Sequence, residues 1–205
     1  MTWRESFQNQ KFKIWFISII LLLLIFLVSV PWYFKNVIEP KPGIQLNDIL
    51  LNLFLPVDHS ILIFILIYAT ITASLVSLVQ KPTQLLLALT AYCMMNYLRV
   101  VTLWLFTLEP PIGIIPLTDT ILEKFIYSNT VILKDLFFSG HMATLTILAC
   151  VEENRKWKIA KWFVTITVGL LLMHQRVHYA VDVLAGVVVS AGIVKSLDRL
   201  KRVNR

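Results

Sequence analysis

Two short polar segments in an otherwise apolar chain carry residue types suited to catalysis. Ser139-Gly140-His141 lies at the expected start of one apolar run, and His178 and Asp182 lie at the start of a later one. On a helix, the i, i+4 spacing of His178 and Asp182 places them on one face, so the carboxylate can orient the imidazole. His141 would add a second imidazole for acid–base work. The pattern predicts a histidine nucleophile with a carboxylate partner, assisted by a second histidine.

Ser139 and Gly140 add features that suit an anion. A hydroxyl and a flexible backbone at the start of a helix come with exposed N–H groups, and a helix N-terminus of this kind is a favourable place for a phosphate. Ionisable residues inside apolar spans are costly and by default indicate function. Together the two segments predict chemistry on a lipid at one membrane face.

The composition defines the setting of these residues. The chain has 205 residues, of which 58% are hydrophobic and 15% charged, and this is too apolar for an ordinary soluble domain. Several uncharged runs reach the roughly 17–25 residues that a helix needs to cross a bilayer. The runs are continuous rather than alternating, so they predict helices and not a barrel. We therefore expect one all-α integral membrane domain over residues 1–205. The net charge of +7 is explained by membrane topology, so no nucleic-acid partner is expected.

Six apolar segments are expected to form a six-helix bundle in the membrane. Pro31 is expected to kink or end the first of them. The fourth and fifth are short for a full crossing, which predicts that their outer ends open onto a polar cavity. The expected spans are Ile14–Phe34, Ile61–Val79, Leu85–Leu108, about Leu136–Val151, about Ile159–Gln175 and Val177–Val194.

The distribution of Lys and Arg predicts the orientation of this bundle. Basic residues are concentrated in the N-terminal segment, the second-to-third and fourth-to-fifth connections, and the C-terminal end. By the positive-inside rule both termini are cytoplasmic, and His141, His178 and Asp182 lie at the outer face. The inner set is Arg4, Lys11, Lys13, Lys81, Arg155, Lys156, Lys158, Lys161, Lys195, Arg199, Lys201, Arg202 and Arg205, and the outer loops hold only Lys35, Lys41, Lys124 and Lys134.

Two outer loops are long enough to have structure of their own. The segment Pro40–His59 is rich in apolar residues and could lie along the membrane interface as an amphipathic or re-entrant element. The segment Glu109–Asp135 contains Thr120-Ile-Leu-Glu123, a weak capping-box pattern for a short helix. Either loop could gate a lipid-facing site, and a passive connection is the alternative for each.

The two polar segments resemble those of a known family. Phe138-Ser-Gly-His141 with His178-x-x-x-Asp182 is similar to the type 2 phosphatidic acid phosphatase superfamily, and more closely to its sphingomyelin synthase branch. That branch has a Gly-Asp-x-x-x-Ser-Gly-His-Thr block, which Lys134 to Met142 matches with Lys for Gly and Met for Thr. Its His-Tyr-x-x-Asp-Val block is matched by His178 to Val183, and its Arg-x-x-Thr segment by Arg99 to Thr102. The resemblance covers roughly Tyr97 to Ala191. The basic blocks of the phosphatase branch are not seen, which favours transferase chemistry.

The resemblance implies a ping-pong reaction on a glycerophospholipid. His178 would attack the phosphorus of the head group with help from Asp182, and His141 would protonate the departing diacylglycerol oxygen. The resulting phosphohistidine would pass its group to a lipid alcohol such as ceramide, or to water. No metal or other cofactor is required by this route. The expected substrate-binding residues are Arg99, Asp135, Ser139, Gly140, Arg176 and Tyr179.

Other interpretations remain open. Hydrolysis of the same bond would make the protein a phospholipase C or a lipid phosphatase. His174, His178 and Asp182 have i, i+4, i+8 spacing and could bind zinc together with His141, as in a metal-assisted hydrolase. A lipid transporter or scaffold is also possible, because intramembrane ionisable residues line transport pathways too. Structural roles are the alternatives for single residues: helix packing for His141, an ion pair for His178 and Asp182, a clamp for Arg99 and a helix cap for Asp135.

Overall fold

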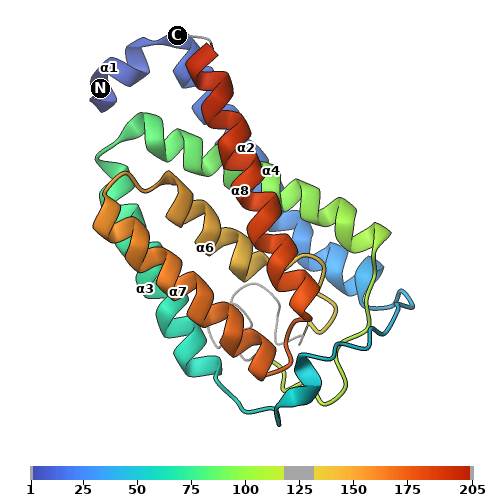
Figure 1. The fold of residues 1–205 in the computed structure, drawn as a ribbon. Coiled ribbons are helices and arrows are strands. Elements are labelled where there is room, and N and C mark those ends of the chain that lie inside the picture. The colour runs from blue at the N-terminus through green and yellow to red at the C-terminus, as the bar shows by residue number, and fades with distance from the viewer. Residues whose placement is uncertain (1, 118–131, 204–205) are drawn as a thin grey trace.

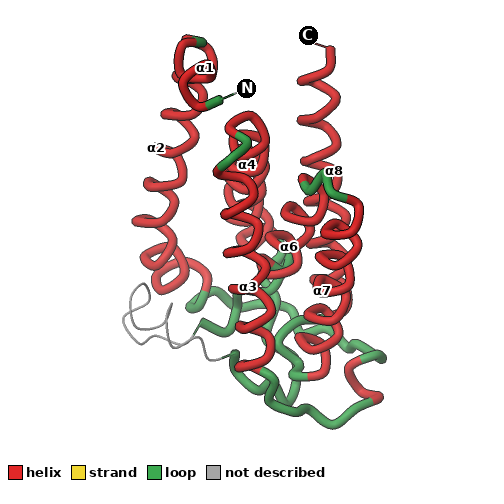
Figure 2. Tube along the Cα trace, turned by 90° about the vertical axis from the view of Figure 1, so that its left-hand side faces the viewer, coloured by secondary structure: helices red, strands yellow, loops and turns green. Residues whose placement is uncertain are grey.

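The chain folds as a bundle of helices. The computed structural model describes residues 2–117 and 132–203, and within these ranges every element is helical and no β-strand is present. Both ends of the chain lie at one end of the bundle, which we call the terminal end (Figure 1). The longer loops gather at the opposite end, which we call the loop end (Figure 2). The predicted all-α architecture is confirmed.

Each of the six expected apolar segments overlaps a helix. Four of these helices are long and apolar enough to cross a membrane, namely α2 with its extension, α3, α4 and α8. Helix α6 has only 12 residues, and α7 begins with a basic stretch. Helix length and composition in the described residues therefore support four spans, and the count of six stays a prediction. The bounds are α1 Trp3–Gln8, α2 Gln10–Tyr33, α3 Ser60–Val79, α4 Pro82–Leu105, α6 Gly140–Val151, α7 Arg155–His174 and α8 Ala180–Val203.

Pro31 does not end the first long helix at once. Helix α2 continues to Tyr33 and passes directly into a π-helical turn, Phe34–Ile38. Proline removes one backbone donor and crowds the carbonyl four residues earlier, so a change of helical geometry just beyond it is expected. The helical path therefore runs a few residues further toward the loop end than the sequence predicted.

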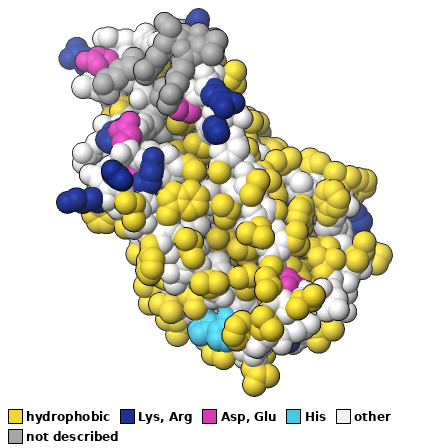
Figure 3. Space-filling view, viewed as in Figure 1, with side chains coloured by type: hydrophobic (Ala, Val, Ile, Leu, Met, Phe, Trp, Pro, Cys, Tyr) yellow, Lys and Arg dark blue, Asp and Glu magenta, His cyan; other side chains and the backbone are white. Residues whose placement is uncertain are grey.

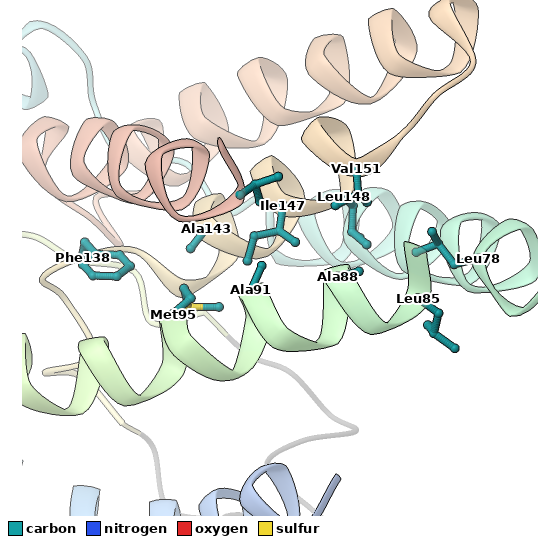
Figure 4. Packing of buried hydrophobic residues seen from close by; sticks show 11 residues of the cluster. Leu78, Leu85, Ala88, Ala91, Met95, Phe138, Ala143, Ile147, Leu148 and Val151 are labelled. Atoms are coloured by element: carbon teal, nitrogen blue, oxygen red, sulfur yellow. The ribbon is translucent and has the colours of Figure 1, made fainter. Parts of the chain in front are cut away.

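Helix α6 lies at the centre of the bundle and packs against α3, α4, α7 and α8. Its sequence is apolar on all sides, which is typical of a buried helix, and most of its side chains are buried. Ala88 and Ala91 of α4 and Ala143 of α6 are small, so these two helices approach closely (Figure 4). Because α6 is covered by protein on most sides, it does not need the length of a lipid-facing span.

The outer surface is apolar where a bilayer would contact it. Val28 of α2 and Ile61 of α3 are each 80% exposed, and many other large apolar side chains on these helices are exposed. Figure 3 shows a broad hydrophobic belt, with Lys and Arg gathered toward the terminal end. Burying such a belt in lipid is strongly favourable. The chain has the features of an integral membrane protein.

The loop end is built from irregular segments, and the interfacial position expected for Pro40–His59 stays a prediction. Between Pro40 and His59 the only helical element is a single 3-10 turn, Leu51–Leu53. Ile44 and Leu108 pair in an isolated bridge that ties this segment to the loop after α4. The expected capping box at Thr120–Glu123 lies outside the described residues.

Candidate active site

The Ser-Gly-His segment lies at the start of α6, where the sequence predicts a helix N-terminus. Ser139 is the N-cap residue, and its hydroxyl accepts a hydrogen bond from the Met142 N–H at 3.4 Å. Such a cap satisfies one of the free donors at a helix N-terminus. His141 is therefore the second residue of the helix, in its first turn. Ser139 itself is fully buried, so its hydroxyl is a helix cap here and does not reach a substrate cavity.

Arg99 of α4 braces the segment that precedes α6. The guanidinium is buried, its Nε donates to the Phe138 carbonyl at 2.8 Å, and its Nη2 forms an ion pair with Asp135. Its Nη1 lies so close to Gly140 that a β-carbon added there would be 2.7 Å away. The glycine is therefore needed for this approach, and Asp135 neutralises a charge that would otherwise be costly inside the bundle.

His178 lies in a turn, so the predicted helical spacing with Asp182 is wrong. Helix α7 ends in a Schellman motif, in which the Val177 N–H bonds to the Leu172 carbonyl at 2.9 Å and Arg176 takes a left-handed φ of 59°. This position usually holds glycine. Helix α8 begins only at Ala180, and His178 precedes it.

Asp182 still faces His178, because it caps the helix that follows. Its Oδ2 accepts the Tyr179 N–H at 3.0 Å, as an acidic residue in the first turn of a helix does in a capping box. The same oxygen lies 3.6 Å from Nδ1 of His178, and the two side chains are 0% and 2% exposed. The pair is thus sealed from solvent and slightly longer than a hydrogen bond.

The two histidine segments are joined through the backbone. The Ser139 N–H donates to the Asp182 carbonyl at 3.1 Å, and Gly186 one turn later would place a β-carbon 2.8 Å from the Ser139 carbonyl oxygen. As a result, the rings of His141 and His178 lie edge to face with centroids 6.1 Å apart. The structure therefore brings together the three residues predicted to be catalytic, from segments far apart in the sequence.

A cavity of about 260 Å³ opens beside His141, between α2, α3, α4 and α6. Arg99, Asp135 and His141 form its polar end together with Gly140 and Thr144, whereas α2 and α3 contribute mostly apolar walls. His178 and Asp182 do not line it and lie behind His141. The apolar and aromatic lining residues are Phe26, Leu27, Val30, Phe34, Phe64, Ile67, Tyr68, Ile71, Tyr92 and Met95.

Arg176, expected to bind phosphate, instead clamps the loops. Its Nη1 donates to the Ile112 carbonyl at 2.8 Å, and its Nη2 donates to the carbonyls of Phe54 at 3.0 Å and Leu51 at 3.2 Å. These bonds offset the roughly 1–2 kcal/mol that a left-handed conformation costs a residue with a side chain. Arg176 lines a separate pocket at the loop end, away from the cavity beside His141.

Tyr179 and Asp48 hold the turn that carries His178. The Tyr179 hydroxyl donates to the Glu109 carbonyl at 2.9 Å and accepts the Leu46 N–H at 3.3 Å. Burial raises the pKa of this phenol, which keeps it neutral and able to donate. Asp48 accepts the Ala180 N–H at 2.7 Å and so caps α8. Tyr179 was expected to bind substrate, and the structure places it in the pocket at the loop end instead.

His174 faces away from the other histidines of the site. Its Nδ1 lies 3.0 Å from Nε2 of His59, across the join between α7 and the segment before α3. In residues 2–117 and 132–203, no three His, Cys, Asp or Glu side chains are grouped closely enough to hold a metal ion. The zinc site considered from the i, i+4, i+8 spacing is therefore not assembled by these residues.

Two polar residues that bear on the site were not predicted from the sequence. Asn96 lines the cavity and is 4% exposed. A signal for it existed, since a polar residue three positions before Arg99 lies on the same helical face. Asp48 had no such signal, because its contact with Ala180 joins residues remote in the sequence.

Comparison with known proteins agrees with this site. The family model described as PAP2 superfamily C-terminal matches residues 134–199, the part of the chain with α6, α7, α8 and both histidines. No curated protein matches the chain. The match supports the type 2 phosphatidic acid phosphatase superfamily, and with it an activity of the lipid phosphatase or phosphotransferase type. The sphingomyelin synthase branch within that superfamily stays a prediction.

Proposed function

We propose that the protein is a membrane lipid phosphotransferase that moves a phospho-head group from a glycerophospholipid to a lipid alcohol such as ceramide. The observation that carries this proposal is the cavity beside His141, whose polar end holds Arg99 and whose other walls are apolar side chains of α2 and α3. A phosphate at the polar end and acyl chains along the apolar walls would match this lining.

His178 does not line the cavity, but its ring centroid lies only 6.1 Å from that of His141, so the first half-reaction requires the phosphoryl group to reach past His141. An imidazole nitrogen of His178 then attacks the phosphorus, and the bond from phosphorus to the diacylglycerol oxygen breaks. His141 donates a proton to that leaving oxygen. Asp182, with Oδ2 3.6 Å from Nδ1 of His178, keeps the proton on Nδ1 and stabilises the positive charge that develops on the ring. The remaining gap closes to a hydrogen bond when substrate binds, as catalytic contacts often do.

In the second half-reaction His141, now neutral, removes the proton from the hydroxyl of the acceptor lipid. The acceptor oxygen attacks phosphorus, the phosphorus–nitrogen bond breaks, and both histidines return to their first states. Position in the cavity supports this double role for His141, because the departing and entering oxygens must both reach the same imidazole. Diacylglycerol therefore leaves the cavity before the acceptor enters.

Charge stabilisation in this scheme comes from Arg99 and the start of α6. The guanidinium lies against Gly140 and offers N–H donors in a fixed plane, which suits a phosphoryl group. Free N–H groups in the first turn of α6 add to the positive potential. Asp135 holds the guanidinium in place through the ion pair.

We further propose that the loop end is the outer side of the membrane. Support comes from the gathering of Lys and Arg toward the terminal end (Figure 3). A cysteine at exposed Ile49, in a chain whose Cys93 and Cys150 are replaced by alanine, should react with an impermeant maleimide in intact cells or sealed vesicles of matching orientation. Labelling only after the membrane is opened would reverse the assignment.

The proposal is tested by product analysis. Purified protein receives mixed phospholipids and isotope-labelled ceramide, beside the His178→Ala variant, and lipids are identified by mass spectrometry. Labelled sphingophospholipid together with diacylglycerol, absent in the variant, is the expected result. Turnover of the same size in the variant would exclude the role of His178.

Hydrolysis is the second candidate, and the family match favours it because that superfamily is named for a phosphatase. Water in place of the lipid alcohol would complete the same two steps on the same residues. The product analysis separates the two activities: diacylglycerol with a free phosphorylated head group or phosphate, and no labelled sphingophospholipid, would identify a hydrolase.

A further inference from the structure

One polar side chain in the cavity wall has no role in the chemistry described above. Asn96 is 4% exposed and lines the cavity. One N–H of its carboxamide donates to the Tyr92 carbonyl at 2.9 Å. Its second N–H and its Oδ1 have no hydrogen-bond partner among the described residues. Because this side chain lines the cavity, its remaining N–H and its Oδ1 can form hydrogen bonds with a molecule that binds there.

The distance between Asn96 and the polar end of the cavity matches a specific part of a lipid. Asn96 precedes Arg99 by three residues, so it lies about 4.5 Å along α4 toward the terminal end. In a glycerophospholipid, five covalent bonds separate the phosphorus from the nearer of the two ester carbonyl carbons, a span of about 6 Å when extended. A phosphate held beside Arg99 and His141 therefore places an ester carbonyl within reach of Asn96.

Thr144 is the other small polar residue nearby, and it is less suited to this contact. Its hydroxyl already donates to the Gly140 carbonyl at 2.8 Å, so it has no hydrogen left to offer a lipid carbonyl. Asn96 retains both a donor and an acceptor. It can donate to an ester carbonyl, and it can also pair with both the N–H and the carbonyl of an amide-linked lipid.

We propose that Asn96 is a specificity-determining residue that recognises the carbonyl-bearing linkage of the lipid, ester or amide, and disfavours ether-linked lipids. This inference rests on the proposed function only for the position of the phosphate. A site built to hydrogen-bond a substrate group discriminates against an analogue that lacks the group, because the protein atoms are then left unpaired.

The test compares diacyl and dialkyl lipids that differ only in the linkage. Binding is measured by lipid titration followed through thermal unfolding, in the His178→Ala background so that no turnover occurs. The probes are dioleoyl phosphatidic acid, dioleoyl phosphatidylcholine and their dioleyl ether analogues. With Asn96 intact, and for whichever head group binds better, we expect the diacyl ester lipid to bind about tenfold more tightly than its ether analogue. Asn96→Leu should remove this tenfold preference, and should change the affinity for the ether lipid by no more than about twofold.

Thr90→Val is the matched control. Thr90 is another buried polar residue of α4, it accepts a hydrogen bond from Trp15 Nε1 at 3.0 Å, and it does not line the cavity. The control should change the binding of ester and ether lipids equally. The inference would be overturned if ester and ether lipids bound equally well with Asn96 intact, or if Asn96→Leu weakened the binding of both by the same factor. Lipid turnover by the wild-type protein would still support the proposed function in either case. If no lipid binds and none is turned over, both fall.

Discussion

The two histidine segments meet the cavity in different ways. His141 is partly exposed and lines the cavity wall, whereas His178 is 2% exposed, lies behind it and faces Asp182. In the proposed reaction this difference has a purpose. His141, as acid and then base, must contact two different substrate oxygens in turn, so it needs access to the cavity. His178, as the phosphorylated nucleophile, must be shielded from stray water.

The largest expected effect separates the two histidines by leaving group. His178→Ala should lower turnover by at least about 10⁴-fold for every substrate, because the nucleophile is gone. His141→Gln should lose as much with a natural phospholipid, but the first turnover of a p-nitrophenyl phosphodiester should be at least about 100-fold faster than that of the phospholipid, because this leaving oxygen needs no proton. Steady-state rates measure the loss in both variants, and the burst of p-nitrophenol measures the recovery. If the activated substrate restored activity in His178→Ala rather than in His141→Gln, His141 would be the nucleophile and His178 the acid.

Intact mass spectrometry sharpens the same comparison. With the activated substrate, His141→Gln should accumulate a phosphorylated chain, since the base that activates the acceptor is missing. The acid-labile adduct should map to His178. An adduct on another residue would contradict the proposed nucleophile.

The next largest effect concerns the buried carboxylate beside His178. Asp182→Asn should keep the cap on Tyr179, because an amide oxygen still accepts that N–H, but should lose the negative charge. Turnover is expected to fall about 10²–10⁴-fold with nearly unchanged thermal unfolding. A large drop in unfolding temperature with a proportionate loss of activity would instead indicate that Asp182 is mainly structural.

A smaller effect is expected where Arg99 meets the helix N-terminus. Gly140→Ala would place a methyl group 2.7 Å from the guanidinium of Arg99. The guanidinium would have to move to relieve this contact, and its displacement should lower kcat/KM about 10–100-fold. Gly192→Ala in α8 is the control, because a β-carbon there meets no atom within 4 Å. Similar activity in both variants would show that the close approach of Arg99 to Gly140 is not required.

The smallest effect lies in the loops, outside both histidine segments. Hydrogen bonds from Lys134 and from the Gly43 N–H lower the pKa of Glu109 below its usual 4.5. The stabilisation is therefore complete above pH 4.5 and is lost as the pH falls through the lowered pKa. Glu109→Gln should reduce the unfolding temperature slightly at neutral pH and progressively less in acid. A difference that does not change with pH would exclude this ion pair as its source.

Local sequence patterns predicted one histidine segment better than the other. Ser139-Gly140-His141 was expected at a helix N-terminus, and α6 does begin at Gly140, although the expected boundary was about Leu136 and the cap formed by Ser139 was not predicted. The position of Arg99 at the site also followed from its charge inside an apolar run. For His178 the i, i+4 spacing was misleading, since the Schellman turn after α7 delays the next helix until Ala180.

Long-range contacts account for the rest of what the sequence did not predict. Arg176 resembles a phosphate ligand in sequence, but its partners are carbonyls from loops that come together only in the folded chain. Asp48 caps α8 across more than a hundred residues. The length of α6 likewise depends on its neighbours, because a central helix is covered by protein and is released from the length that a bilayer demands.

The backbone bond between Ser139 and Asp182 has a consequence for how such a protein can diversify. The bond joins a backbone N–H to a backbone carbonyl, so any residue except proline at position 139 retains the donor. The spacing of the two histidines therefore depends on the backbone fold and not on the side chain at position 139. The cavity walls on α2 and α3 carry no such restriction. Libraries confined to those two helices should therefore yield altered lipid preferences while the reacting groups keep their alignment.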